Sequence, residues 1–259
     1  MTPSYENNIK LLNEYFDKIY ILTLPRATER HLNIQNNLIG LNFTFFYGTD
    51  KLELDEEDLI KKNIYDKKTS IKKNRYYKPM KLGEIACSMG HKAIYEDAVL
   101  HNYSRILILE DDVIFNKDGL MSLESILNQL PSNWDVLYFD YFKNEHSNLF
   151  SNIKKLMYQF QRKIGLLNRT QLTIKNLFAK SYSQNLKISG YHDYASAYAI
   201  THSAAKVVIE LQTPIIFPAD HVLPYAITNN LLNGFISIPK VFEQQSQSFK
   251  EKIGSYVEN

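Results

Sequence analysis

The stretch R-I-L-I-L-E-D-D-V-I-F-N, at residues 105–116, carries the strongest structural signal in this chain. Four apolar residues run directly into three consecutive carboxylates, Glu110, Asp111 and Asp112. The short apolar run predicts a strand that is buried on both faces, as strands of parallel sheets are. Because like charges repel, the three carboxylates favour a cation at the end of this strand, with a solvated acidic turn as the alternative.

The beginning of the chain predicts the same kind of sheet. Residues 18–24 form an apolar run rich in β-branched side chains, residues 28–39 have helical spacing, and residues 42–47 have the pattern of a second strand. The order strand–helix–strand favours a parallel sheet in an α/β protein. Ligands of such sheets bind beyond the carboxyl ends of the strands, which is where residues 110–112 lie.

The spacing within the acidic cluster has a chemical consequence. Because side chains alternate along an extended chain, Glu110 and Asp112 can share one direction while Asp111 points away. Hard divalent cations prefer carboxylate oxygens, and Mg²⁺ typically binds one or two carboxylates together with substrate phosphates. The cluster therefore predicts a site for Mn²⁺ or Mg²⁺.

A long helix is predicted over residues 82–100. One of its faces is apolar, and the nearly opposite face carries a polar stripe of four residues, Glu84, Ser88, His91 and Tyr95. Two interpretations stay open. Either the helix packs on the core and keeps the polar stripe in water, or the polar stripe faces a ligand.

The second half of the chain predicts further strands and helices. Residues 132–142 contain a strand and an aromatic cluster, and a strand through residues 198–200 precedes a helix whose cap is Thr201 or Ser203. Another helix is predicted at residues 221–229. Asp220, just before it, is placed either as a helix cap or as a functional carboxylate.

The middle of the chain is strongly basic. Residues 146–189 contain eight Lys or Arg residues and no acidic residue. Within them, residues 151–168 have apolar side chains on a narrow arc of a helical wheel, with Lys154, Lys155, Arg162 and Lys163 off that arc. A basic amphipathic helix of this kind can lie on an anionic membrane. Packing of the apolar stripe on the protein's own core, or on a second subunit, is the alternative.

Composition limits the classes of function. Of the 259 residues 44% are hydrophobic, and the net charge of +2 gives no general argument for binding nucleic acid. The lone cysteine, Cys87, fits a reducing compartment, and the N-terminal residues lack a signal-peptide pattern. Apolar runs stay shorter than the roughly 18 residues that a membrane span needs. We expect a cytoplasmic protein, with peripheral contact to the inner face of the membrane as a further expectation.

Taken together, these segments resemble glycosyltransferase family 25, the bacterial lipooligosaccharide glycosyltransferases related to collagen galactosyltransferases. The family has Asn and an acidic residue in its first loop, where this chain has Thr23 and Pro25. The segments that carry the resemblance occur in the family's order: I-Y-I-L-T-L-P-R-A-T-E-R (19–30), L-G-E-I-A-C-S-M-G-H-K-A-I-Y (82–95), L-I-L-E-D-D-V (107–113), W-D-V-L-Y (134–138), A-Y-A-I-T-H-S-A-A (197–205) and P-A-D-H-V-L (218–223).

The resemblance implies an α/β, GT-A type, Rossmann-like fold with a mostly parallel central sheet and a basic helical insertion. It implies one domain over residues 1–259: a nucleotide-sugar-binding half (1–142), the basic amphipathic insertion (143–190) and an acceptor-side half (191–259). The implied reaction is inverting transfer of a hexose, with galactose favoured, from a UDP-sugar to a glycan or glycolipid such as lipooligosaccharide. A homodimer stays open.

Two other classes compete with this interpretation. One is a relative of the transferases that only binds glycan. The other is a metal-dependent nucleotidyl or phosphoryl transferase, which also uses paired acids but is disfavoured because the chain lacks a phosphate-binding loop motif.

Roles for individual residues follow from the resemblance as expectations. Asp112, with Glu110, is expected to bind Mn²⁺ or Mg²⁺, and Asp220 is the first candidate for the catalytic base, ahead of Asp193 and Asp140. His221 is an alternative metal ligand. The residues expected to bind the donor are Thr23, Leu24, Arg26, Arg30, Glu84, Ser88, His91, Glu110 and Asp111. Those expected to bind the acceptor are Asp140, Tyr191, Asp193 and Tyr194, with Tyr198 as a further aromatic candidate.

Overall fold

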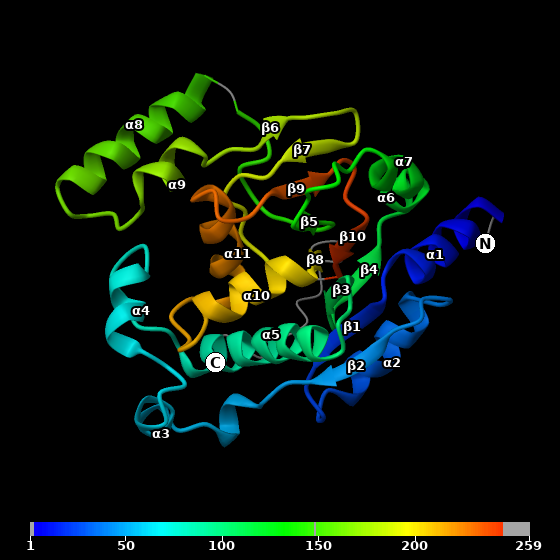
Figure 1. Cartoon of the computed structure of the whole chain (residues 1–259), viewed down its shortest axis with the longest axis horizontal. Coiled ribbons are helices and arrows are strands. Elements are labelled where there is room, and N and C mark those ends of the chain that lie inside the picture. The colour runs from blue at the N-terminus through cyan, green and yellow to red at the C-terminus, as the bar shows by residue number, and fades with distance from the viewer. Residues whose placement is uncertain (1–2, 148, 246–259) are drawn as a thin grey trace.

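The computed structural model, which describes residues 3–147 and 149–245, is a mixed α/β structure built on a large sheet (Figure 1). Eight strands lie in the order β2-β1-β3-β8-β5-β9-β7-β6. The strands of this sheet are β1 Lys18–Thr23, β2 Thr44–Tyr47, β3 Arg105–Glu110, β5 Val136–Tyr138, β6 Lys180–Ser181, β7 Leu186–Ile188, β8 Ala197–Thr201 and β9 Gly234–Ser237. A separate antiparallel pair joins β4 Val113–Phe115 to β10 Phe242–Gln244.

The sheet is mostly parallel, as the sequence predicts. Strands β2, β1 and β3 pair in parallel, and so do β5 and β9. Strand β8 is antiparallel to both β3 and β5, and β7 is antiparallel to both β9 and β6. All strands of the large sheet except β8 and β7 therefore point the same way. The direction of β8 could not be predicted, because burial on both faces gives the same apolar pattern in either direction.

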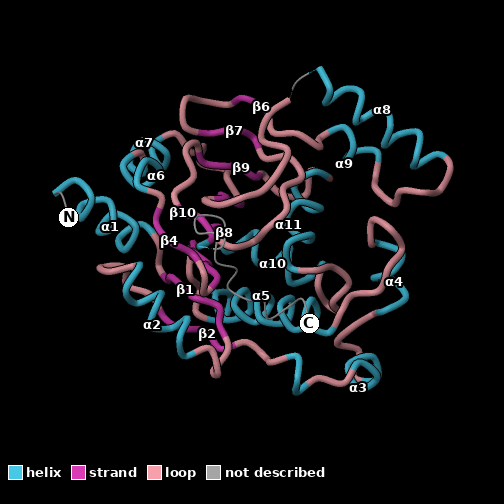
Figure 2. The backbone as a smooth tube through the Cα atoms, turned by 180° about the vertical axis from the view of Figure 1, so that it is seen from behind, coloured by secondary structure: helices cyan, strands magenta, loops and turns pink. Residues whose placement is uncertain are grey.

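Helices cover both faces of the sheet (Figures 1 and 2). The side chains of β3 alternate between the two faces of the sheet, and each face has its own hydrophobic core. Leu107 and Leu109 belong to the first core, and Ile106 and Ile108 belong to the second. The first core is completed by α1, α2, α6 and α7, and the second by α5, α10 and α11. The bounds of these helices are α1 Pro3–Tyr15, α2 Thr28–Asn37, α5 Leu82–Leu100, α6 Lys117–Met121, α7 Leu123–Asn128, α10 His202–Leu211 and α11 Ala219–Thr228.

Helix α5 has the predicted bounds, but its polar stripe does not face water. Ser88, His91 and Tyr95 are all buried, and His91 and Tyr95 meet the hydroxyl of Tyr198 on β8. Leu100, the last residue of the helix, is largely exposed. The wheel argument fails here because α5 is covered on more than one side, so polar side chains bury as hydrogen-bonded groups.

The charged segment at residues 53–78 forms a surface excursion of short helices. The 3-10 turn η1 Lys51–Glu53 leads into this segment, which contains helices α3 Glu56–Lys61 and α4 Lys67–Lys73. Asp55 and Asp66 accept hydrogen bonds from backbone amides at the starts of α3 and α4. These caps explain why acidic residues begin the short helices in this segment.

The basic insertion at residues 143–190 is not purely helical. It contains α8 Leu149–Lys163 and α9 Gln171–Lys175, followed by the hairpin β6–β7, which extends the large sheet through β9. Helix α8 begins at Leu149, shortly before the stretch 151–168 that the sequence analysis describes as amphipathic. Helices α8 and α4 lie at the same end of the molecule, away from α1 and α2 (Figures 1 and 2). Among the described residues, no helix has the length and apolar character to cross a membrane.

A buried histidine gives the fold a predictable sensitivity to acid. His192 is fully buried, its Nδ1 lies 2.7 Å from the backbone oxygen of Lys143, and its Nε2 accepts the amide of Gly190. Burial lowers the pKa of His192 from 6.5 to about 4. The folded protein therefore keeps this ring neutral at pH values where the unfolded chain protonates it, and stability is lost as pH falls from about 6.5 towards 4.

We expect this group alone to lower the free energy of unfolding by about 2 kcal/mol between pH 7.5 and pH 5. Urea unfolding of wild type and His192→Gln at both pH values measures it, because the variant should lose that part of the pH dependence. The exposed His101, changed to Gln, is the matched control. An equal pH dependence in wild type and His192→Gln would contradict the assignment.

Candidate active site

A cavity of about 300 Å³ opens beyond the carboxyl ends of β1, β2 and β3. Its position agrees with the general location of ligand sites in open α/β sheets. The residues that line it are Leu22, Thr23, Leu24, Arg30, Gly48, Thr49, Asp50, Lys51, Gly83, Ala86, Cys87, Glu110, Asp111, Asp112, Tyr194 and Gln244. We call this space the donor cavity. It brings together all three carboxylates of the acidic cluster with Thr23, Leu24, Arg30 and Tyr194.

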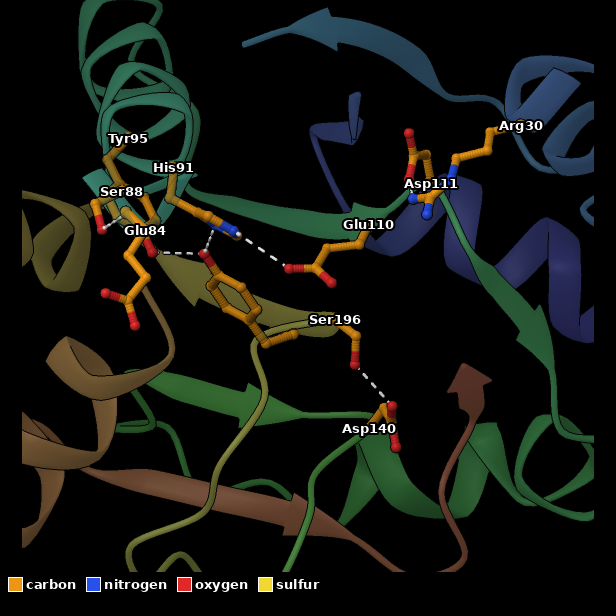
Figure 3. A network of polar contacts seen from close by, with 10 residues as sticks. Arg30, Glu84, Ser88, His91, Tyr95, Glu110, Asp111, Asp140 and Ser196 are labelled. Carbon is orange, nitrogen blue, oxygen red and sulfur yellow. Dashed lines mark hydrogen bonds and ion pairs between the residues drawn. The ribbon is translucent and has the colours of Figure 1, made fainter. Parts of the chain in front are cut away.

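Glu110 and Asp111 point in opposite directions, as the alternation of side chains along an extended chain predicts. Figure 3 shows Glu110 directed towards His91, and Asp111 directed the opposite way, towards Arg30. Asp111 is buried, forms an ion pair with Arg30 and accepts a 2.5 Å hydrogen bond from the hydroxyl of Thr23. The negative charge of Asp111 is therefore balanced within the protein. The hydroxyl of Thr23 already binds protein atoms, so any contact of Thr23 with the sugar donor would use its other atoms.

Asp112 has properties that suit a metal ligand. Its Oδ1 is buried and has no hydrogen-bond partner in the described part of the chain. Burial, reinforced by the charge of Glu110, raises the pKa of Asp112 to about 7. An ionised carboxylate in such a place costs free energy unless a positive charge meets it. The carboxylate oxygens of Asp112 and Glu110 are suitable ligands for a hard divalent cation.

A second group of possible metal ligands shares Glu110. The Sγ of Cys87, the Nε2 of His91 and a carboxylate oxygen of Glu110 all lie within 4.8 Å of one another. Thiolate and imidazole ligands suit Zn²⁺ rather than Mg²⁺ or Mn²⁺. Burial, together with nearby carboxylates, raises the pKa of the Cys87 thiol well above its usual value. A protonated thiol is a poor ligand, so the carboxylate pair is the stronger candidate.

A buried chain of side chains orients Glu110. The Nδ1 of His91 lies 2.8 Å from the hydroxyl of Tyr198, which lies 2.5 Å from the hydroxyl of Tyr95. These contacts fix the ring of His91 so that its Nε2 lies 3.8 Å from Oε1 of Glu110 (Figure 3). His91 and Tyr95 therefore position the acidic cluster. They do not line the donor cavity.

The other polar residues of α5 also differ from the expectation that they bind the donor. Ser88 is buried and donates to the backbone oxygens of Glu84 and Phe217. The carboxylate of Glu84 accepts the backbone amide of Lys81 at the start of α5. Residues of α5 that do line the donor cavity are the small ones, Gly83, Ala86 and Cys87. Small side chains leave room for a ligand, which a search for polar groups overlooks.

Arg26 lies beside the donor cavity without lining it. It forms an ion pair with Asp50, which does line the cavity. The hydrogen bond from the Arg26 guanidinium lowers the pKa of Asp50. Asp50 also accepts the amide of Leu52 and so fixes the turn after β2. Arg26 therefore shapes the cavity wall through Asp50.

The residues expected to bind the acceptor lie in different places in the structure. Tyr194 lines the donor cavity and stacks on Phe142. Asp193 forms a 2.8 Å ion pair with Lys143 at the protein surface. Tyr191 is mostly buried beside α9, and Tyr198 is fully buried.

Asp140 cannot contact an acceptor, which corrects the expectation from sequence. It is fully buried, pairs with Lys240 at 3.0 Å and accepts a 2.7 Å hydrogen bond from Ser196 (Figure 3). Burial raises the pKa of its carboxyl. Tyr138, Phe139 and Tyr141 around Asp140 belong to the core, whereas Phe142 is exposed, so most of the aromatic pattern in this segment reflects packing.

Asp220 is free of the capping role that competed with a catalytic one. Helix α11 begins at Ala219 with Pro218 as its N-cap, so Asp220 lies inside the first turn. Its side chain is 38% exposed and lies 3.9 Å from Nε2 of His221. Partial burial raises the pKa of Asp220, while the adjacent His221 opposes the rise. A carboxylate that is exposed, and whose pKa is raised, is suited to accept a proton near neutral pH.

Besides the small residues of α5, two further parts of the donor cavity were missed by sequence analysis. Residues 48–51 follow β2 directly, and the rule that located the acidic cluster after β3 applies equally to them. The glycine and the aspartate in G-T-D-K were the available signal. Gln244 comes from β10, which pairs with β4 across a long separation in sequence, so no local pattern could have placed it.

The fold and the site define an α/β protein with a carboxylate-rich ligand cavity at the ends of its parallel strands. A family model described as glycosyltransferase family 25 (LPS biosynthesis protein) matches residues 16–223, and the chain belongs to this family. The match includes the acidic cluster and Asp220.

Curated relatives come from insects and mammals. A glycosyltransferase 25 family member of Aedes aegypti is 26% identical over 219 residues, which is 82% of this chain and 31% of the relative. Human procollagen galactosyltransferase 2 is 24% identical over 128 residues, 48% of this chain and 20% of the relative. Human inactive glycosyltransferase 25 family member 3 is 24% identical over 147 residues, 55% of this chain and 20% of the relative. The chain thus spans about a third or less of the length of these relatives.

Proposed function

We propose that this chain is a metal-dependent, inverting glycosyltransferase of the GT-A type that moves a hexose from a UDP-sugar to a glycan acceptor. The observation that carries the proposal is the acidic cluster at the end of β3, with an unpartnered oxygen of Asp112 beside a cavity of about 300 Å³. Membership of the family supports transfer of a sugar. Galactose is favoured because one relative is named as a galactosyltransferase.

The proposed mechanism assigns separate tasks to the two sides of the donor cavity. Mn²⁺ or Mg²⁺, held by Asp112 and Glu110, would supply positive charge for the leaving diphosphate. Arg30 holds Asp111 so that it stays out of this task, and His91 holds Glu110 in place. Asp220 accepts the proton of the acceptor hydroxyl as that oxygen attacks the sugar's anomeric carbon. The acceptor is proposed to be a cell-surface glycan such as lipooligosaccharide, in keeping with the family's description.

The alternative with a specific observation in its favour is a relative that binds glycan without catalysis. Relatives named as inactive exist, and they align with about half or more of this chain. Retention of Glu110, Asp112 and Asp220 in this chain supports the enzyme instead.

A panel of UDP-galactose, UDP-glucose and other nucleotide-sugars, each incubated with the protein and Mn²⁺, separates these proposals. A transferase should release UDP from one donor by slow hydrolysis, and faster with an acceptor. Binding of a donor without UDP release would favour the non-catalytic relative. Release of pyrophosphate or a sugar phosphate would favour a nucleotidyl or phosphoryl transferase.

Helix α8 supports a proposed contact with an anionic membrane. Its apolar stripe is exposed in the structure, which contradicts packing on the protein's own core; Phe150 is 76% exposed and Leu156 is 65% exposed. Arg162 and Lys163 are exposed at the end of the helix, and residues 146–189 contain no acidic residue. Each cation near an anionic surface contributes about 1 kcal/mol. An exposed apolar stripe with positive charge around it complements an anionic lipid surface, and a lipid-anchored acceptor would be found there.

We expect the protein to co-sediment with phosphatidylglycerol vesicles at low salt and much less with phosphatidylcholine vesicles. Changing Phe150, Leu156 and Phe160 to Ser should abolish sedimentation, because the stripe supplies the inserted apolar surface. The matched control changes three exposed apolar residues elsewhere, Leu32, Ile39 and Leu100, to Ser. Absence of vesicle binding at low salt overturns the proposal, and a dimer that the α8 variant dissolves would assign the stripe to a second copy.

A further inference from the structure

A second cavity, of about 160 Å³, lies where the end of α4, the segment before α9 and the start of α11 meet. Figures 1 and 2 show α4 and α9 facing each other at this end of the molecule. Its charged lining residues are all basic or histidine, with no carboxylate among them. They are Lys72, Lys73, Arg75, Arg169 and His221. We call this space the basic cavity.

Arg169 has two buried N–H groups without a hydrogen-bond acceptor in the described residues. Its guanidinium stacks on the ring of Tyr191 at 3.7 Å, which fixes its plane. Its Nε and Nη1 are buried and make no hydrogen bond within the described residues. Burial lowers the pKa of Arg169, and the neighbouring charge of Arg75 acts in the same direction. The fold thus holds a desolvated guanidinium with two donors unused.

Arg75 brings a second guanidinium to the same cavity. Its Nη2 donates a 2.5 Å hydrogen bond to the hydroxyl of Tyr158, and its Nε is buried without a hydrogen-bond partner in the described residues. The backbone oxygen of Arg75 accepts the amide of Asn168, which ties it to the residue next to Arg169. Among the described residues, no carboxylate forms an ion pair with either arginine.

Two neighbouring guanidinium groups that form no ion pair with a carboxylate in the described residues repel each other and lose hydration, so this arrangement costs stability. Proteins keep such groups where an anion compensates for the cost, and guanidinium donors match the geometry of phosphate and carboxylate. A volume of about 160 Å³ suits a charged substituent rather than a whole nucleotide-sugar.

We propose that the basic cavity binds an oxyanion, a phosphate or carboxylate group, carried by the glycan acceptor. His221 lines the cavity and adjoins Asp220, so an anion held there places the rest of the acceptor beside the proposed base. Binding of the oxyanion is a property of this cavity alone, and only its assignment to the acceptor rests on the proposed transferase function.

Calorimetry with the full chain tests the site. The probes are galactose 6-phosphate, galacturonic acid and galactose, each titrated in the presence of saturating UDP and Mn²⁺ so that the donor cavity is filled. We expect one or both anionic sugars to bind and galactose to bind far more weakly. The anionic sugar that binds more tightly shows whether phosphate or carboxylate is the preferred group.

Arg169→Gln should weaken binding of the anionic sugar about ten-fold or more, because a charged hydrogen bond is lost. Arg169→Lys should restore part of it, and Lys175→Gln, which removes an exposed charge on α9, should leave it unchanged. The melting temperature of Arg169→Gln should not fall by more than about 2 °C, because removal of a buried charge without an ion-pair partner offsets the loss of stacking on Tyr191.

Equal affinity for galactose and its anionic forms, or equal affinity of wild type and Arg169→Gln, overturns the proposal. Displacement of the anionic sugar by UDP would also overturn it, because the ligand would then share the donor cavity. Anion binding in a protein that releases no UDP from any donor would confirm the oxyanion site while rejecting the transferase, so the two failures are distinguishable.

Discussion

Asp112→Asn is expected to reduce turnover of the nucleotide-sugar by about 10³-fold. Asp112 presents a buried oxygen without a hydrogen-bond partner to the donor cavity. A metal at a leaving diphosphate contributes several kcal/mol, and about 4 kcal/mol corresponds to three factors of ten in rate. UDP release, measured at saturating Mn²⁺, gives the comparison.

The same substitution should not weaken the fold. The pKa of Asp112 is about 7 in the folded protein and near 4 in the unfolded chain, so its contribution to stability falls as pH rises through that interval. Asparagine lacks this dependence. In excess chelator the variant should therefore melt above wild type at pH 8 and near it at pH 5, which calorimetry can follow.

Two other variants locate the metal. Asp118→Asn, an exposed acid outside the cavity, is the matched control and should keep full turnover. Cys87→Ser should keep most of its activity if Asp112 and Glu110 bind the metal, but should lose it if Cys87, His91 and Glu110 do. Full turnover by wild type in excess chelator would contradict metal dependence altogether.

Asp220→Asn is expected to lower transfer by about 10²- to 10⁴-fold, the range typical of a lost general base, while leaving donor affinity intact. Asp220 is partly exposed, has a raised pKa and caps no helix. Because it does not line the donor cavity, UDP should bind the variant and wild type alike. Calorimetry with UDP and Mn²⁺ measures affinity, and UDP release with acceptor measures transfer.

The matched control for Asp220 is Asp193→Asn, which removes a nearby carboxylate that is paired with Lys143. Little change in its transfer rate would assign the base to Asp220, whereas a loss confined to Asp193→Asn would move the role to that residue. Normal transfer by Asp220→Asn would show that another group accepts the proton.

The parts of the fold that the sequence predicts are those set by local periodicity. Strands β1 and β3 and helix α5 follow directly from apolar runs and helical spacing, and their parallel order follows from the connections. The direction of β8 and the pairing of β4 with β10 depend on contacts far apart in the chain, which no local pattern encodes. The sequence therefore locates the carboxyl ends of the strands, but it does not locate every segment that lines the donor cavity.

In the candidate site, too, the residues placed correctly are those set by local sequence, and the residues placed wrongly depend on the whole fold. The acidic cluster and Thr23, Leu24 and Arg30 reach the donor cavity because they follow strands whose ends meet there. Ser88 and Asp140 were misplaced because a polar residue in a pattern indicates a binding site only if it is accessible, and burial is a property of the whole fold. The basic cavity depends on α4, α9 and α11 meeting, so neither Arg75 nor Arg169 could be paired from sequence.

Backbone hydrogen exchange, measured with and without UDP plus Mn²⁺, tests the central claim that the donor binds at the acidic cluster. We predict slower exchange at residues 48–51 and 110–112, which border the donor cavity, and unchanged exchange at residues 72–75 and 168–170, which border the basic cavity. Protection of residues 72–75 and 168–170, with none at residues 48–51 and 110–112, would contradict the account.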